Sequence, residues 1–510
     1  MEERRTSPER RENARQSPRR RTETPAPRSV LEEIPWRAVV PVIALVLLSA
    51  GAWSYSQNAS IDDVPTEPIN YAVQLRTPLL SARRVPETLQ QPLADEALAP
   101  EIAKLLSGSG PNACLIVEEG DRVINITNPR TSLVPASNQK LILTSAVLSQ
   151  YGPDHTFTTT VTASAPTIDG VMDGTLYLIG GGDPFLATDA WRAQYGDDQE
   201  GRATTRFEDL ADAVAASGIT RITGAVQGDE SFFDNVRFGP WAERLIASNQ
   251  SGPLSALSVN EGFISWPEEF AGSFRARTPA TDPALNAAEV FTELLADRNI
   301  TVDGGAQAAP APTGLITVAS IQSPPLIDIV THINSYSNNH GAEMLVKYLG
   351  RTERSIGTTE AGVAVIRSIL EVQRFDLGGV RIDDGSGLAE TDRATCTLLA
   401  DILERAGPDS PLVRTLSIGG ERGSLLERHE GTPADGNVFA KTGTLNGVTA
   451  LSGVAESAKD PETDLIFSYI VNGESIGLNE TVKALQEPFV EALVAYPNAP
   501  LLTELGPLQP

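Results

Sequence analysis

The sequence predicts an α/β protein of the α+β kind, in which antiparallel strands pack against helices. Alternating apolar and polar residues form strand pairs joined by tight turns, as from Cys114 to Ile126 with its turn at 119–121. Longer apolar or amphipathic stretches have the length of helices, among them residues 141–148, 342–349 and 480–496. Because strands joined by short turns pair antiparallel, we expect antiparallel sheets flanked by helices.

The composition describes a globular and strongly acidic protein. Of its 510 residues, 41% are hydrophobic and 21% charged, and the formal net charge is -26. A chain of this length exceeds one ordinary core, so we expect several domains or a domain with a large insertion. The acidic balance argues against nucleic-acid binding, which requires a basic face.

The N-terminal region differs from the rest of the chain. Residues 1–37 predict a disordered cytoplasmic tail, because they are rich in arginine, glutamate and proline and have few large apolar residues. The uncharged run 38–53, preceded by arginines and flanked by aromatic residues, favours a membrane anchor. It is shorter than the roughly 20 residues of a comfortable span, so a signal segment cleaved near Ala52 is the alternative. Residues 54–100 predict a polar, proline-rich spacer.

The chain has two cysteines, Cys114 and Cys396, and four histidines. In an exported protein the cysteines could form a disulfide, and they could equally be two small buried residues, because the sequence does not give their separation. The histidines show no spacing typical of a metal site or of a Ser-His-Asp relay. We therefore expect no metal and no other cofactor.

Ser137 and Lys140 lie at the start of the apolar helix 141–148 and one helical turn apart, so their side chains share a face. A serine is a weak nucleophile until a base takes its proton. A lysine can be that base only where burial or another cation lowers its pKa. The pattern S-x-x-K is common by chance, so the pair needs partners elsewhere in the chain.

Two later segments carry side chains of the required kinds. Ser337 and Asn339 precede the helix 342–349, where a hydroxyl and an amide could relay a proton and hold a substrate. Both residue types are also ordinary helix caps. Lys441 lies in an alternating strand with Gly443, where the missing side chain would let a ligand approach the backbone. A solvated surface lysine is the plain alternative.

In combination, S-x-x-K, S-x-N and K-T-G, in this order and on a helix, a helix start and a strand, are specific. From about residue 111 to 473 the sequence resembles the low-molecular-mass class C penicillin-binding proteins, a family of D-alanyl-D-alanine carboxypeptidases and endopeptidases. About 200 residues separate the first two motifs, which is typical of this family and not of class A β-lactamases. Further likeness lies in residues 180–184, 255–260, 342–343, 384–388 and 439–445.

The resemblance implies a transpeptidase- or β-lactamase-like catalytic domain, an antiparallel sheet flanked by helices. Residues 101–163 and 313–510 would form this domain, and residues 164–312 would form an inserted, mainly β domain.

The resemblance also implies a role for each catalytic residue. Ser137 would be the acylated nucleophile and Lys140 its base. Ser337 would pass the proton to the leaving amine, while Asn339 would position Lys140 and the substrate amide. The backbone N–H groups of Ser137 and Thr444 would form the oxyanion hole.

A second group of residues would bind the peptide. Lys441 would hold the terminal carboxylate of a peptidoglycan stem peptide, with Thr442, Gly443 and Thr444 beside it on the strand. Glu243 is a candidate contact for the amine of the stem peptide, with an ordinary surface acid as the alternative.

The expected function is that of a serine D-alanyl-D-alanine carboxypeptidase, with endopeptidase activity as a further expectation. It would hydrolyse stem peptides through an acyl-enzyme, and β-lactam antibiotics would trap the same serine. The alternatives are a β-lactamase or serine esterase on the same fold and a non-catalytic cell-wall-binding protein. We expect the protein at the cell membrane, single-pass with its catalytic domain outside the cytoplasm, or secreted if the segment is cleaved.

Overall fold

The computed structural model describes residues 85–195, 201–267, 274–474 and 477–498, together with Leu47 and Ser49. The predicted tail, nearly all of the predicted membrane anchor and the spacer up to residue 84 lie outside the described residues, so these predictions stay untested. Within the described ranges, no helix combines the length and the hydropathy that crossing a membrane requires. The described residues from 85 to 498 belong to one compact unit.

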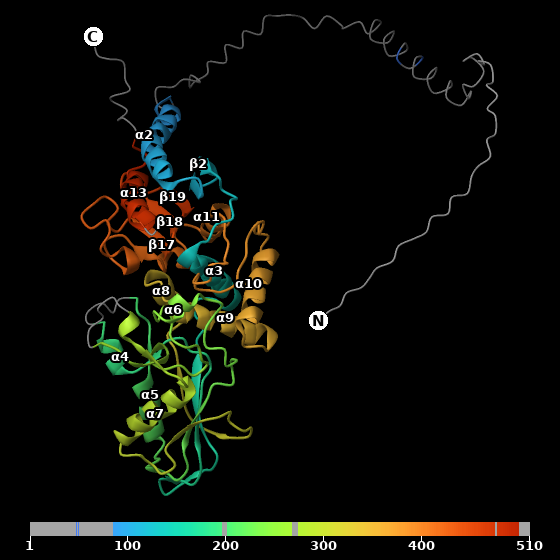
Figure 1. The fold of residues 1–510 in the computed structure, drawn as a ribbon, viewed down its shortest axis with the longest axis vertical. Coiled ribbons are helices and arrows are strands. Elements are labelled where there is room, and N and C mark those ends of the chain that lie inside the picture. The colour runs from blue at the N-terminus through green and yellow to red at the C-terminus, as the bar shows by residue number, and fades with distance from the viewer. Residues whose placement is uncertain are drawn as a thin grey trace, which may run out of the picture. The chain divides into compact units, whose positions relative to one another are not determined.

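The first sheet has six strands, all antiparallel, in the spatial order β16-β17-β18-β19-β1-β2 (Figure 1). Its central strands β18 and β19 are buried along almost their whole length. Segments far apart in the chain thus meet in one sheet. The strand bounds are β1 Ala113–Glu119, β2 Arg122–Thr127, β16 Ser417–Ile418, β17 Val438–Leu445, β18 Val448–Glu456 and β19 Asp464–Asn472.

Alternating side chains give this sheet two buried faces, each covered by helices. In β1, Leu115 and Val117 pack in the core formed with α2 (Val85–Ser109) and α13 (Gly477–Val494), whereas Ile116 packs in the opposite core. The predicted sheet with helices on both sides is confirmed. The helices of the second face are α3 Gln139–Tyr151, α8 Leu326–Ser335, α9 Asn339–Arg354, α10 Thr359–Val372, α11 Cys396–Ala406 and α12 Pro411–Arg414.

Helix α2 begins inside the predicted spacer 54–100, which is a difference from the sequence prediction. Pro92 and Pro100 suggested a broken segment, but both lie within the helix. Leu98 and Leu105 are buried in the core that α2 shares with α13. Burial of this apolar face offsets the two hydrogen bonds that the prolines cannot make.

The insertion is built on a second, five-stranded sheet in the order β14-β10-β6-β3-β15. Strand β10 is parallel to β6 and β14, whereas β3 is antiparallel to β6 and β15. Helices α5 (Phe207–Ala216) and α7 (Pro283–Ala296) pack in its core. The strand bounds are β3 Thr158–Ala163, β6 Leu176–Ile179, β10 Val226–Asp229, β14 Ala306–Ala308 and β15 Ile316–Gln322.

The insertion therefore differs from the prediction in two respects. It is a mixed α/β unit, because its buried face is filled by helices as well as strands. Its sheet also includes β3 and β15, which lie in the ranges predicted for the catalytic domain, so the sheet extends beyond the predicted limits of 164–312.

Short elements complete both parts of the fold. The helix η1, which carries Ser137, runs directly into α3. The bounds of the short elements are β4 Thr167–Ile168, β5 Val171–Met172, β7 Leu186–Ala187, β8 Thr205–Arg206, β9 Arg221–Ile222, β11 Phe263–Ser265, β12 Thr278–Pro279, β13 Thr301–Val302, α4 Asp189–Ala193, α6 Glu243–Ile246, η1 Ala136–Asn138, η2 Asn260–Gly262, η3 Phe274–Ala276 and η4 Gly423–Leu425.

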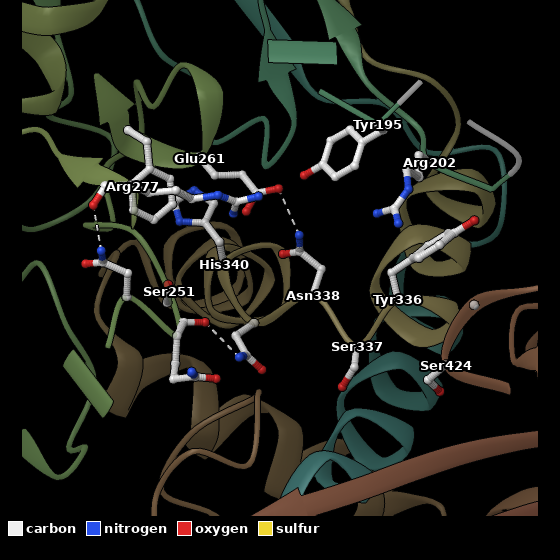
Figure 2. Close-up of a pocket in the computed structure, with 15 residues that line it drawn as sticks. Tyr195, Arg202, Ser251, Glu261, Arg277, Tyr336, Ser337, Asn338, His340 and Ser424 are labelled. Carbon is white, nitrogen blue, oxygen red and sulfur yellow. Dashed lines mark hydrogen bonds between the residues drawn. The ribbon is translucent and has the colours of Figure 1, made fainter. Parts of the chain in front are cut away.

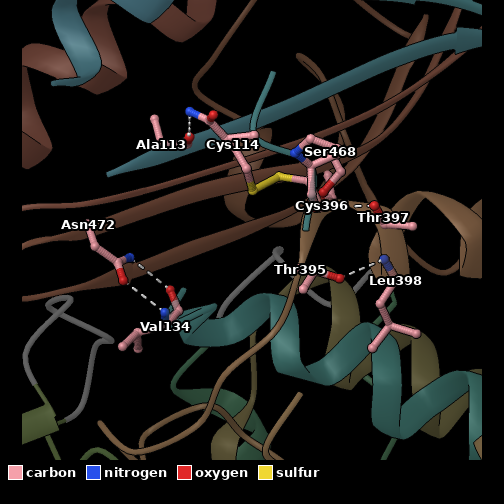
Figure 3. The surroundings of a disulfide bond; sticks show 12 residues. Ala113, Cys114, Val134, Thr395, Cys396, Thr397, Leu398, Ser468 and Asn472 are labelled. Carbon is pink, nitrogen blue, oxygen red and sulfur yellow. Dashed lines mark hydrogen bonds between the residues drawn. A yellow bond between two sulfur atoms is a disulfide. The ribbon is translucent and has the colours of Figure 1, made fainter. Parts of the chain in front are cut away.

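Cys114 and Cys396 form a disulfide, with their Cα atoms 6.0 Å apart (Figure 3). The alternation in β1 directs Cys114 to the face where α11 packs, and Cys396 is the first residue of that helix. The sequence left open whether the two cysteines pair, and the structure shows that they do. The disulfide connects β1 to α11 across a sequence separation of 282.

Candidate active site

Ser137 and Lys140 lie at the start of a largely buried helix of the catalytic part. Ser137 belongs to η1, and Lys140 lies in the first turn of α3, where Leu141 and Ile142 have no exposed surface. The Nζ atom of Lys140 is 3.0 Å from the Oγ atom of Ser137. Ser137 is half-buried, whereas Lys140 is fully buried. The structure thus brings the two predicted side chains into hydrogen-bonding contact.

The chain leading to Ser137 is held from the end of the sheet. The N–H of Val134 donates to Asn472 Oδ1 at 2.8 Å, and Asn472 Nδ2 donates to Val134 O at 3.0 Å (Figure 3). Asn472 is the last residue of β19, so this two-way contact fixes the backbone three residues before the serine. Such a constraint is what a preorganised nucleophile needs.

Gly443 packs against the serine turn. A Cβ atom on Gly443 would lie 2.8 Å from both Asn138 Nδ2 and Pro135 O. The sequence suggested that this glycine admits a ligand to the strand backbone. In the structure it admits η1 itself, so β17 and the serine turn approach closely because residue 443 lacks a side chain.

Ser337 lies in the turn between α8 and α9, with a φ of 55°, which is uncommon for a residue other than glycine. Its neighbour Asn338 is the N-cap of α9, and the Asn338 Oδ1 atom accepts the N–H of Gly341 at 2.8 Å. The capping role that competed with the functional reading of Ser337 and Asn339 thus belongs to the residue between them.

Asn339 connects Lys140 to the insertion. Its Oδ1 atom accepts from Lys140 Nζ at 2.7 Å, and its Nδ2 atom donates to the main-chain oxygen of Gln250 at 2.8 Å. The third partner of Lys140 Nζ is the main-chain oxygen of Ser386, at 2.7 Å. Sequence reasoning assigned no role to Gln250, and it included Ser386 only in the likeness at residues 384–388, because a backbone carbonyl has no signature in residue type.

The partners of Lys140 determine where its lone pair points when the amine is neutral. The Asn339 amide oxygen and the Ser386 carbonyl oxygen can only accept, so each must receive an N–H from Lys140. A neutral amine has two N–H groups and one lone pair, which leaves the lone pair for the hydroxyl of Ser137. Burial lowers the pKa of Lys140 to about 7, although nearby carboxyl groups oppose this shift. At neutral pH a substantial fraction of Lys140 can therefore act as a base.

Lys441 is fully buried, which excludes a solvated surface lysine. Its Nζ atom donates to the main-chain oxygen of Thr442 at 3.1 Å. Burial is the main cause that holds the pKa of Lys441 well below its usual value, and the charge of Lys140 adds to it. The Oγ1 atom of Thr442 is 2.7 Å from the Oγ atom of Ser424. Gly443 is buried beside η1, and the side chain of Thr444 is exposed.

A pocket of about 180 Å³ opens beside Ser337, and the catalytic part and the insertion both line it (Figure 2). The catalytic part contributes Ser337, Asn339 and Ser424, and the insertion contributes Gln250 and Glu261. Glu261 is buried, and its Oε1 atom accepts a hydrogen bond from Asn338 Nδ2 at 2.9 Å. Burial raises the pKa of Glu261. The insertion is therefore one wall of the site and also supports the S-x-N turn.

The structure does not bring every predicted residue to this pocket. Glu243 is the exposed first residue of α6 and is not among the described residues that line the pocket. Its role as a contact for the stem peptide stays a prediction. The same holds for the backbone N–H groups of Ser137 and Thr444 as oxyanion donors, although η1 and β17 pack against each other.

A serine in contact with a buried lysine of lowered pKa, with a second buried lysine on a neighbouring strand, defines a Ser-Lys type of acyl-transfer site. The chain matches the model of the D-Ala-D-Ala carboxypeptidase 3 (S13) family over residues 109–273 and 265–494, and it belongs to that family. The predicted serine-type D-alanyl-D-alanine carboxypeptidase is thus confirmed at the level of the family.

Individual relatives agree with this assignment. The chain is 32% identical over 418 residues to a D-alanyl-D-alanine carboxypeptidase from Actinomadura sp. (strain R39), covering 67% of this chain and 74% of the relative. A carboxypeptidase from Mycobacterium tuberculosis is 30% identical over 389 residues, covering 71% and 79% of the two chains. The fold is similar to the crystal structure of penicillin binding protein 4 (dacB) from Haemophilus influenzae, with a TM-score of 0.63, 20% identity and coverage of 76% and 99%.

Proposed function

We propose that the protein hydrolyses peptidoglycan stem peptides ending in D-Ala-D-Ala through an acyl-enzyme on Ser137, with Lys140 as the general base. The observation that carries this proposal is the pair of obligatory acceptors on Lys140, the amide oxygen of Asn339 and the carbonyl oxygen of Ser386. They direct the remaining lone pair to the Ser137 hydroxyl, whose proton a base must remove.

In the acylation step, Lys140 takes the proton of Ser137 and the Oγ atom attacks the carbonyl carbon of the penultimate D-alanine. The C–N bond of the peptide then breaks, and the leaving amine receives a proton by way of Ser337. Backbone N–H groups of Ser137 and Thr444 stabilise the oxyanion, each contributing on the order of 3 kcal/mol. Water then hydrolyses the ester, with Lys140 again as the base.

Lys441 binds the terminal carboxylate of the peptide, with Thr442 and Thr444 beside it. Burial lowers the pKa of Lys441. A carboxylate next to Lys441 favours its charged form and so counteracts this lowering of the pKa. A charged Lys441 in turn disfavours a second charge on Lys140. Substrate binding therefore keeps the base in its neutral, reactive form.

The proposal includes endopeptidase activity, because the pocket beside Ser337 gives the leaving group space beyond a single alanine. In the proposed reaction Ser337 passes the proton to the leaving amine, and this residue lines the pocket of about 180 Å³. A cross-linked peptide, whose leaving group is larger than alanine, is therefore an expected substrate alongside the free stem peptide.

Release of free D-alanine from an N-acyl peptide ending in D-Ala-D-Ala tests the carboxypeptidase activity. The wild-type full chain should release it and Ser137→Ala should not, while a peptide ending in L-Ala-L-Ala should stay intact. Penicillin distinguishes the alternative on the same fold. Rapid turnover of penicillin without a lasting adduct would favour a β-lactamase, and binding of stem peptides without any hydrolysis would favour a non-catalytic cell-wall-binding protein.

The proposed location is the cell membrane, with residues 38–53 as the anchor. The support is the uncharged apolar run with arginines before it and aromatic residues at both ends. Cell fractionation of the full chain and of a chain without residues 1–53 tests this proposal. Recovery of the full chain in the membrane fraction would support it, and a mature N-terminus near Ala52 would show cleavage instead.

A further inference from the structure

Three carboxyl groups without exposed surface lie near the base: Glu343 on α9, and Asp384 and Asp392 in the loop that follows α10. None of the three lines the pocket beside Ser337. They are therefore buried acids for which the proposed reaction has no direct use. Burying carboxyl groups is costly unless they are hydrogen-bonded or neutral.

Glu343 is linked to Lys140 through two residues of backbone. Its Oε1 atom accepts the N–H of Gly385 at 3.0 Å and the N–H of Ser386 at 2.7 Å. The carbonyl oxygen of Ser386 then accepts from Lys140 Nζ at 2.7 Å. Asn339 lies four residues before Glu343 on α9, so the same helix bears both a direct partner of Lys140 and the support of its other acceptor.

The neighbouring Asp384 is the better site for a negative charge. Its Oδ1 atom accepts the N–H of Gly387 at 2.7 Å, and its Oδ2 atom accepts from the N–H of Ala389 at 2.8 Å and from Trp241 Nε1 at 3.0 Å. By contrast, Glu343 Oε2 is buried with no hydrogen-bond partner in the described part of the chain. An oxygen without donors favours the protonated acid.

We propose that Glu343 is a positioning residue for Lys140: its uncharged carboxyl group holds the Gly385–Ser386 backbone so that the Ser386 carbonyl oxygen receives one N–H of the lysine. The Lys140 lone pair is then left for Ser137. This inference rests on the proposed function, in which Lys140 is the base. A charged Glu343 would hold the same backbone but would also stabilise the protonated, unreactive lysine.

The electrostatics of the surroundings agree with an uncharged Glu343. Burial, followed by the charge of Asp384, raises the pKa of Glu343 to about 8. The charged or titratable groups that face this position are Asp384 and Asp392 from the loop and Lys140 from α3, with Lys441 of β17 beyond Lys140. An ionised Glu343 would raise the pKa of Lys140, whereas an uncharged Glu343 leaves it unaffected, as a glutamine at this position would.

The test is the second-order rate of acylation by penicillin as a function of pH, measured for the wild-type full chain, Glu343→Gln and Glu343→Ala. Glu353→Gln, an exposed acid on the same helix, is the matched control. In Glu343→Gln the amide oxygen can still accept from the loop, so the rate at the alkaline plateau should stay within about threefold of wild type. The midpoint of its acidic limb should stay at the wild-type pH, because Glu343 is already uncharged where Lys140 titrates.

Glu343→Ala releases the loop, and its plateau rate should fall by about tenfold or more, since a misplaced base is costly. A role in folding alone would lower both variants alike, and that result would overturn the proposal. A midpoint of Glu343→Gln at lower pH would show that Glu343 is ionised in the wild type and would overturn it too. So would a plateau and midpoint of Glu343→Ala equal to those of wild type. Failure of the wild-type protein to be acylated at any pH would instead contradict the proposed function.

Discussion

In the proposed mechanism, Lys140 is the residue whose charge decides whether Ser137 can react. Because burial lowers its pKa to about 7, the rate of penicillin acylation should fall as the pH decreases through this value. The protonated lysine then has no lone pair to accept the serine proton. Stopped-flow or quenched measurements of acylation between about pH 5 and 9 check this. A rate that stays constant down to pH 5 would show that Lys140 is not the base.

Replacing Lys140 should separate activity from stability. In the folded protein the pKa of Lys140 lies below its value in the unfolded chain, so the buried lysine destabilises the fold at every pH below the unfolded value. This cost disappears as the pH rises above that value. Lys140→Met should therefore reduce acylation by about 10²–10⁴-fold and melt at the same or a higher temperature at pH 7.

Lys347 is the matched control for that substitution, because it is also fully buried but pairs with Asp234 and donates to Val236 O at 2.8 Å. Lys347→Met leaves the carboxylate of Asp234 without its ion-pair partner, whereas Lys140→Met leaves only neutral acceptors, so Lys347→Met should lower the melting temperature. A lower melting temperature of Lys140→Met than of Lys347→Met would contradict the assignment of Lys140 as a strained, functional lysine.

At this scale the sequence identified residues but not their backbone partners. Ser137 and Lys140 followed from helical spacing, and Lys441 from its place on an alternating strand. The acceptors Ser386 O and Gln250 O could not be predicted, because any residue type supplies a carbonyl oxygen. Glu343 appeared in the sequence only as part of the family likeness at residues 342–343, and no role was assigned to it.

Among the elements, the contact between β17 and η1 depends on a glycine. In Gly443→Ala the new Cβ atom would lie 2.8 Å from Asn138 Nδ2 and Pro135 O, and one of these is backbone. The strand and the serine turn must then separate, so acylation should slow by about tenfold or more. Gly378→Ala, whose nearest atom is an aspartate side-chain oxygen at 3.1 Å, is the control. Equal acylation rates in the two variants would contradict a tight packing requirement.

Elements with one clear apolar face were the most predictable. The expected helices 141–148 and 342–349 lie within α3 and α9. Helix α2 was missed because two prolines outweighed a regular apolar face whose partner, α13, lies almost 400 residues later. Parallel pairing of β6, β10 and β14 was missed because strands of three or four residues give too little periodicity.

For the whole molecule, the disulfide between Cys114 and Cys396 connects the two chain segments of the catalytic part, one before and one after the insertion. It closes a long loop, with a sequence separation of 282. Replacing both cysteines by alanine should lower the free energy of unfolding by about 2–4 kcal/mol, measured by denaturant unfolding without reducing agent. Reduced wild-type protein is the control and should show a similar loss. Equal stability of the oxidised and reduced forms would show that the bond does not stabilise the fold.

The dependence of the site on the insertion was beyond sequence reasoning. Gln250 O and Glu261 contact Asn339 and Asn338 across 89 and 77 residues of sequence. Such contacts exist only after both sheets have formed and packed. The sequence therefore predicted the insertion as a separate domain, whereas the structure makes it part of the active site.

The most direct test of the Ser137 acyl-enzyme is the intact mass of the full chain after incubation with penicillin. We predict one penicillin per wild-type chain, and no adduct on Ser137→Ala. An adduct that persists on Ser137→Ala would place the nucleophile elsewhere. An unmodified wild-type chain with the penicillin still intact would contradict the acyl-enzyme itself.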